Sequence, residues 1–128
     1  MIVSDASLII ALLHETDPHH AVARDLVRDV MTDGLVHPIT LAEVLVAAAR
    51  RGVAAEVLSD LEELGFRADV PDAGQPVRLA ELRVDTGLKL PDCCVLDVAL
   101  AQHAPLATFD DRLATVAEAR DLQVLPTR

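Results

Sequence analysis

Four acidic side chains fall where the sequence changes from an apolar run to a helical pattern. They are Asp5, Glu43, Asp92 and Asp110. Carboxylates that converge at one place repel each other, and such a cluster is tolerable mainly when a hard cation lies among them. Oxygen ligands of this kind suit Mg²⁺ or Mn²⁺. The residue types therefore predict a divalent metal site, provided that the fold gathers them.

The apolar and helical patterns indicate which elements position these residues. We expect five strands, at residues 1–4, 35–39, 66–70, 106–108 and 123–125. We expect helices at residues 6–14, 16–31, 40–51, 53–64, 77–86, 93–103 and 111–120. Thr40 is the expected cap of the third helix, and Gly87 is expected to end the fifth. The alternation predicts an α/β sandwich with a central, mostly parallel five-stranded sheet, as one domain over residues 1–128.

This topology predicts where the acidic residues meet. In open parallel sheets the ligand crevice lies outside the carboxyl ends of the strands. Asp5 follows the first strand and Asp110 the fourth, while Glu43 and Asp92 lie in early turns of helices that begin near that edge. Acids near helix starts are also ordinary capping residues. Capping does not require two of them to follow strands, so the whole set favours a shared pocket.

Composition narrows the class of protein. The 128 residues are 52% hydrophobic, with two Phe and no Trp or Tyr, so the core must be aliphatic and little aromatic surface is available for stacking bases. The net charge of −10 argues against a general DNA-binding protein. It favours a small-molecule enzyme, a metal site, or a partner that supplies basic groups.

The cysteines and the N-terminal segment bear on location. Cys93 and Cys94 are adjacent, a spacing that strains a disulfide, and two reduced thiols fit a cytoplasmic protein. The apolar run at 7–13 is too short for a membrane span and has no basic region before it, so we expect neither a signal peptide nor a membrane anchor.

An ordered set of motifs resembles a known family. Asp5-Ala6-Ser7 follows an opening strand, Leu41-Ala42-Glu43-Val44 is internal, Pro91-Asp92 opens an alanine-rich helix, and Thr108-Phe109-Asp110 precedes Arg112-Leu113. Together, over nearly the whole chain, they resemble a PIN domain, in particular the VapC toxins of bacterial VapBC toxin–antitoxin pairs.

The resemblance implies a metal-dependent endoribonuclease that is silenced by a cognate VapB-type antitoxin, with a homodimer inside the complex. Asp5, Glu43, Asp92 and Asp110 match the family's acidic Mg²⁺ or Mn²⁺ site, and Ser7 and Thr108 match supporting hydroxyl positions. The implied reaction is in-line attack of an activated water on phosphorus, with the 3′-oxygen leaving and a 5′-phosphate product.

Further charged residues stay open at this stage. Lys89 and Arg112 lie within a few residues of site acids, where they either contact RNA phosphates or lie on solvated helix faces. Asp97 lies about 140° around its helix from Asp92, so a partly buried helix acid is the better interpretation. Asp111 replaces Asp110 in the site if the register is shifted by one. His19, His20 and His37 lack the spacing of a metal site and are expected to be surface or capping residues.

Two other functions compete with the ribonuclease. A Rossmann-like phosphatase or phosphoryl-transfer domain would use Asp5 as phospho-acceptor, but such a scheme usually needs an Asp at position 7, where this chain has Ser, and a late lysine, whereas Lys89 is the only lysine. A non-catalytic PIN-like binding module would not need the intact set of four acids.

Apolar stripes are expected at residues 22–31 and 53–64. Most of their residues are expected to pack in the core, and any that stay exposed would suit contact with a second copy of the chain or with an antitoxin helix.

Overall fold

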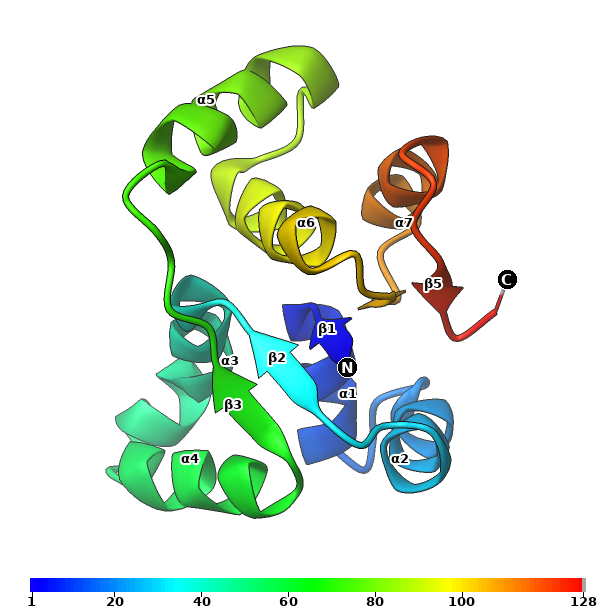
Figure 1. Ribbon diagram of the computed structural model, residues 1–128. Helices are drawn as coiled ribbons and strands as arrows, with labels where there is room; N and C mark the ends of the chain where they lie inside the picture. Colours follow the sequence, from blue (N-terminus) through cyan, green and yellow to red (C-terminus); the bar gives the residue numbers. More distant parts are fainter. Residues whose placement is uncertain (128) are drawn as a thin grey trace.

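Five short strands form a sheet at the centre of the fold (Figure 1). The computed structural model describes residues 1–127. Within them the strands are β1 (Ile2–Ser4), β2 (Gly34–Val36), β3 (Phe66–Ala68), β4 (Leu106–Ala107) and β5 (Val124–Leu125). The helices are α1 (Ala6–Leu13), α2 (His20–Asp29), α3 (Pro38–Arg50), α4 (Ala54–Glu63), α5 (Gln75–Thr86), α6 (Leu90–Gln102) and α7 (Asp111–Ala119).

The sheet has the order β3-β2-β1-β4-β5, and every neighbouring pair is parallel. The predicted α/β fold with a mostly parallel sheet is therefore confirmed, and the sheet is in fact entirely parallel. All five strands point their carboxyl ends toward the same edge, which is where a parallel sheet places a ligand. None of the helices in residues 1–127 is long and apolar enough to cross a membrane.

Alternate residues of β1, β2 and β4 contact different layers of helices. Val3, Leu35 and Leu106 belong to a cluster that includes α6 and α7. Val36 belongs to a second cluster with α1 to α4, and Ala107 to a third with α1 and α2. This alternation is the period of a β-strand whose two faces are both covered. Figure 1 shows the resulting layers, with α5 lying outside α6.

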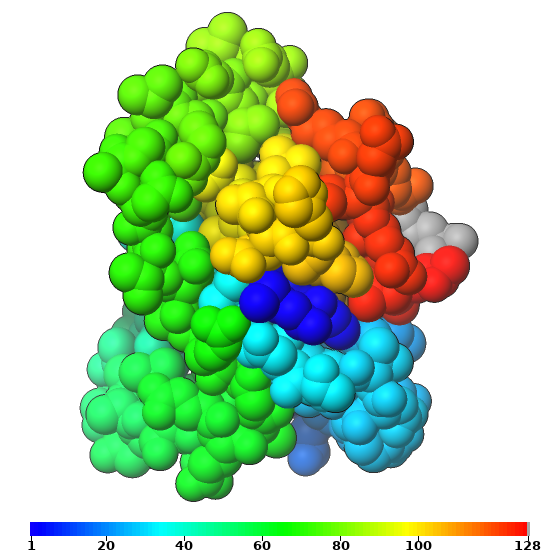
Figure 2. Space-filling view, viewed as in Figure 1, coloured from blue at the N-terminus to red at the C-terminus, as the bar shows by residue number. Residues whose placement is uncertain are grey.

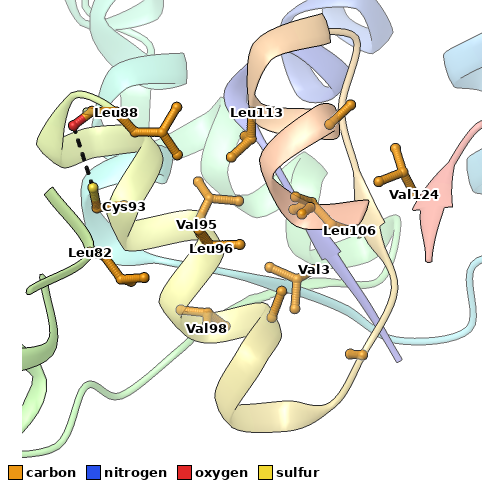
Figure 3. Close-up of a cluster of buried hydrophobic side chains, with 14 of the residues drawn as sticks. Val3, Leu82, Leu88, Cys93, Val95, Leu96, Val98, Leu106, Leu113 and Val124 are labelled. Carbon is orange, nitrogen blue, oxygen red and sulfur yellow. Dashed lines mark hydrogen bonds between the residues drawn. The ribbon is translucent and has the colours of Figure 1, made fainter. Parts of the chain in front are cut away.

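Helix α6 has the most buried residues of the helices in residues 1–127. Its residues from Cys93 to Ala99 are all buried in sequence, so this helix lacks a polar stripe. Val95, Leu96 and Val98 pack against strand residues and against Leu113 of α7 (Figure 3). The thiol of Cys93 donates to the carbonyl of Leu88 at 3.5 Å, and both cysteines are free. Figure 2 shows α6 beside the N-terminal end of the chain, where Met1 is exposed while the residues of β1 that follow it are buried.

The turn between α5 and α6 determines where α6 begins and therefore where Asp92 lies. Gly87 ends α5 in the left-handed conformation, with φ of 71°, as predicted for this glycine. The Thr86 hydroxyl donates to Leu82 O at 2.6 Å and accepts the N–H of Leu88 at 3.1 Å. Leu88 is then buried, and α6 begins two residues later with Asp92 in its first turn.

The predicted strand at 35–39 and the predicted Thr40 cap are wrong. The strand ends at Val36, and His37 is the N-cap of α3, where its Nδ1 accepts the N–H of Ile39 at 3.0 Å. Pro38 occupies the first turn, a position for which its fixed φ is suited. Thr40 is fully buried inside the helix. His37 is thus a capping residue, as expected, but it is buried rather than on the surface.

The helix predicted at 16–31 is shorter than expected and begins at His20. The Asp17 carboxylate accepts the N–H of His19 at 2.8 Å, and the Asp17 carbonyl accepts the N–H of His20 at 3.0 Å. Asp side chains that bond the backbone two residues on stabilise a turn in competition with a helix. The polar Thr16-Asp17-Pro18 segment therefore forms a turn that leads into α2 rather than its first turn.

Candidate active site

Asp5 is the central acid of the site. It follows β1 directly, and its N–H donates to Ala107 O at 2.9 Å, which keeps the ends of β1 and β4 together. Its side chain is buried, with 6% of the residue exposed. Oδ2 accepts hydrogen bonds from the Ser7 hydroxyl at 2.9 Å and from the Thr108 hydroxyl at 2.7 Å. No described residue donates to Oδ1, so one oxygen is oriented by the protein and the other is available to a ligand.

The two hydroxyls connect Asp5 to the loop after β4. Ser7 Oγ accepts the N–H of Phe109 at 2.9 Å, and Thr108 Oγ1 accepts the N–H of Asp110 at 3.0 Å. Each hydroxyl therefore uses its lone pairs on backbone and directs its proton to Asp5. Ser7 and Thr108, predicted as supporting residues, do contact the acid they were expected to orient.

Asp110 begins α7 at the same edge. Its Oδ1 accepts the N–H of Leu113 at 2.9 Å, which makes it the N-cap of the helix. Asp111 is the first helical residue and is exposed. The charge of Asp110 is among those that raise the pKa of Asp92.

Glu43 and Asp92 complete the acidic set from two other helices. Burial, and then the charges of Asp5, Asp110 and Glu43, raise the pKa of Asp92 to about 6, while Lys89 opposes the rise. Partial burial and the charge of Asp5 raise the pKa of Glu43. These mutual effects require the four carboxyl groups to lie near one another. The four acids that the sequence singled out therefore act on one another electrostatically, but no three of them converge on one point in residues 1–127.

The set fits a hard divalent cation in its chemistry but is not closed around one point. No group of three His, Cys, Asp or Glu side chains in residues 1–127 lies close enough to hold a metal ion as it stands. Anions without a counter-charge repel, and the raised pKa values of Asp92 and Glu43 are the signature of that repulsion and of burial. The all-oxygen donor set, with Asp5 Oδ1 open, is the type that Mg²⁺ and Mn²⁺ bind.

Lys89 and Arg112 lie at the rim of this site. Lys89 occupies the N-cap position of α6, and its charge lowers the pKa of Asp92. Arg112 is exposed and donates to Gly87 O at 3.2 Å, which connects the first turn of α7 to the turn before α6. Both cations are therefore next to the acids from α6 and α7, and exposed to solvent.

Asp97 lies outside the acidic set, in agreement with its interpretation as a buried helix acid. It is 4% exposed and accepts from Arg78 at 2.8 and 3.0 Å and from Gln75 Nε2 at 3.0 Å. Gln75 Oε1 in turn lies 2.9 Å from His37 Nε2. A cavity of about 460 Å³ next to Asp97 and Arg78 is lined by none of the four site acids, and Arg78 neutralises the buried acid in it. We therefore place the chemistry at the sheet edge and not in this cavity.

Two contacts, one made by His37 and one by His19, could not be predicted from the sequence. His37 connects α3 to Gln75 of α5 over 38 positions, and no spacing signals that. His19, expected only on the surface or at a cap, stacks on Phe109, the residue between Thr108 and Asp110. The position of Phe109 beside two site residues was the one available signal.

An entirely parallel α/β sheet with acidic residues gathered at its carboxyl edge defines the class of protein. The family model of the PIN domain matches residues 2–119, and this chain belongs to the PIN-domain family. A comparison of this chain with curated protein sequences found no match.

Solved structures of toxins share the fold. The Mycobacterium tuberculosis VapC20 toxin, described as cleaving the sarcin–ricin loop, aligns with a TM-score of 0.76 at 18% identity over 91% of this chain and 95% of that chain. VapBC-1 of nontypeable Haemophilus influenzae gives 0.70 at 20% identity, over 97% and 96%. A toxin–antitoxin complex of Klebsiella pneumoniae gives 0.73 at 22% identity, over 86% and 87%.

Proposed function

We propose that this chain is a metal-dependent endoribonuclease toxin of a type II toxin–antitoxin pair. The observation that carries the proposal is the Asp5 carboxylate, which Ser7 and Thr108 hold by one oxygen while the other stays open. The charge of Asp5 acts on Glu43 and on Asp92, and the charge of Asp110 acts on Asp92 as well. Membership of the PIN-domain family supports nuclease chemistry, and the toxins that share the fold support the biological role.

The proposed cofactor is Mg²⁺ or Mn²⁺, held by Asp5, Glu43, Asp92 and Asp110. When bound, such an ion offsets the negative charge, polarises phosphoryl oxygens and lowers the pKa of water. The protein prepares for it: Ser7 and Thr108 fix the orientation of Asp5. Asp92, with its pKa of about 6, would bind such an ion in its deprotonated form, so its metal affinity should rise with pH.

The proposed substrate is RNA, and the charge of the chain is consistent with a need for counter-ions. A protein of net charge −10 repels a polyanion unless cations screen the approach. We propose that Lys89 and Arg112, which are exposed near the site acids, contact RNA phosphates. Such contacts position the strand without reading its sequence.

The proposed partners are an antitoxin of the VapB type and a second copy of this chain. Structural relatives were crystallised as toxin–antitoxin complexes, and one of them, FitAB bound to a DNA fragment, matches this chain at 18% identity with a TM-score of 0.72. An antitoxin segment carrying basic groups would complement the acidic set.

The decisive experiment is cleavage of RNA by the purified chain, free of any antitoxin. We expect cleavage with Mg²⁺, loss of cleavage with EDTA, and loss in Asp5→Asn with the fold retained by circular dichroism. Asp60→Asn, an exposed acid in α4, is the matched control and should cleave normally.

Two results would point elsewhere. Hydrolysis of a phosphomonoester without RNA cleavage would favour a phosphatase. Absence of Mn²⁺ binding by calorimetry, together with no cleavage, would favour a binding module.

A further inference from the structure

The imidazole of His19 and the ring of Phe109 form a parallel stack. Their centroids are 4.3 Å apart and their planes differ by 9°. The two residues come from separate segments: His19 lies at the N-cap of α2, and Phe109 follows β4. The metal-binding acids do not account for this pair, and in a chain with two Phe and no Tyr or Trp it is an unusual concentration of ring surface.

Hydrogen bonds fix the stack to the site. The N–H of Phe109 donates to Ser7 Oγ at 2.9 Å, and the same hydroxyl donates to Asp5 Oδ2 at 2.9 Å. Phe109 also stands between Thr108, which contacts Asp5, and Asp110. The ring pair therefore keeps a constant position relative to the carboxylates.

The two rings differ in burial. Phe109 is half-buried and packs against the cluster that contains Leu8 and Leu26, so it forms the inner layer. His19 is exposed and lies on it with one face. The Asp17 carboxylate holds the N–H of His19 at 2.8 Å, and His20 Nδ1 lies 2.9 Å from Ala11 O, so the turn that carries the ring is itself fixed.

An exposed, flat ring held beside a phosphodiesterase site can accept another flat ring. Stacking uses the π-face that every base has, so it tolerates any base and adds binding energy that does not come from contacts with phosphates. That suits a chain of net charge −10, whose exposed cations at the rim are few.

We propose that His19, supported by Phe109, stacks an unpaired base of the RNA next to the scissile phosphate. This inference rests on the proposed ribonuclease function and adds a requirement for an unstacked nucleotide at the cleavage position. His19 is a positioning residue: it holds a base, and the carboxylates act on the phosphate.

The test uses Asp5→Asn as a non-cleaving background and a single-stranded RNA oligomer carrying 2-aminopurine at successive positions, in Mg²⁺ buffer. Stacking quenches 2-aminopurine fluorescence. We expect quenching at one position, its loss on adding His19→Ala, and binding weaker by about tenfold. His19→Tyr should restore both, because it restores a ring. His14→Ala removes another exposed histidine and should change neither.

Cleavage kinetics supply a second readout. In the otherwise unaltered protein, His19→Ala should raise KM about tenfold with little change in kcat, which is the signature of lost ground-state binding. Double-stranded RNA, whose bases are already stacked, should bind equally well to both proteins.

The outcomes distinguish a failure of the stacking site from a failure of the proposed ribonuclease function. Quenching that depends on the His19 ring, in a protein that never cleaves RNA, would keep the stacking site and overturn the nuclease. Normal cleavage with unchanged quenching and affinity in His19→Ala would keep the nuclease and overturn the stacking site.

Discussion

The hydroxyl oxygen of Thr108 lies 2.7 Å from Oδ2 of Asp5, although 103 positions separate the two residues. Thr108 accepts the N–H of Asp110 with the same oxygen, so its proton is directed at the carboxylate. The orientation of the central acid is thereby coupled to the turn that begins α7. Because β1 and β4 are neighbours in the sheet, a contact so remote in sequence is a local one in the fold.

Removal of that hydroxyl should weaken the site without removing an acid. We expect Thr108→Val, which keeps the side-chain shape, to lower Mn²⁺ affinity and cleavage by roughly 10–100-fold, the usual effect of losing a group that orients a ligand. Calorimetry and cleavage assays measure the two losses. Thr108→Ser keeps the hydroxyl and should stay close to the unsubstituted protein. Equal activity of the Val and Ser variants would contradict the role of the hydrogen bond.

The raised pKa of Asp92 predicts how stability depends on pH in the metal-free protein. In the folded state the pKa is about 6, against an ordinary value of 3.8. Between those values the folded protein holds a proton that the unfolded chain has lost. Stability from this group is therefore complete below the lower value and is lost as the pH rises through the higher one. Chemical denaturation in EDTA from pH 4 to 7 measures the slope.

The control for that slope is Asp92→Asn, which has no proton to lose. We expect it to flatten the fall in the free energy of unfolding, and Mg²⁺ to raise stability at neutral pH in the unsubstituted protein but less in the variant. A steeper fall with rising pH in Asp92→Asn would show that another group is responsible.

The ion pair of Asp97 and Arg78 should matter more for stability than pairs on the surface. The Asp97 side chain is 6% exposed, so Arg78→Ala leaves a buried charge with only Gln75 as partner. We expect the thermal midpoint to fall on the order of 5–10 °C. Arg67→Ala breaks a pair whose side chains are 53% and 35% exposed and should cost about 2 °C or less. Calorimetric melting compares them, and similar losses would refute the distinction.

Lys89 should contribute to RNA binding rather than to chemistry. Lys89→Ala is expected to raise KM, leave kcat nearly unchanged and reduce the slope of binding against salt by about one, as for one lost phosphate contact. Steady-state kinetics over a salt series measures this. Arg50→Ala, an exposed cation in the last turn of α3, should leave the slope as it is. A drop in kcat with KM unchanged would place Lys89 in the reaction instead.

The parallel sheet, and the edge at which the acids lie, could be predicted because both follow from short-range signals. An apolar run followed by Asp5 or by Thr108-Phe109-Asp110 indicates a strand end, and parallel strands collect their ends at one edge. The position of Asp92 could be predicted because Pro91, the residue before it, is typical of the first turn of a helix.

The features that could not be predicted were of two kinds: some had a stronger alternative nearby in the sequence, and others depended on contacts between residues far apart in the sequence. Thr40 is a good cap by residue type, but Pro38 already started the helix and His37 supplied the acceptor. The pairing of Asp97 with Arg78, and the stacking of His19 on Phe109, join residues that no periodicity relates. Such pairs are set by how the layers pack, which a pattern along one chain does not contain.

Because the site acids lie at one edge of the sheet, a label can be attached to the protein far from them. Gly52 lies just after α3 with φ of 74°, is exposed, and has open space where a side chain would begin. Helix α3 starts after the carboxyl end of β2 and carries Glu43 early, so this turn is at the far end of the helix from the acids. A fluorophore or affinity handle inserted beside Gly52, with the glycine itself kept because of its positive φ, would leave the acidic edge unobstructed.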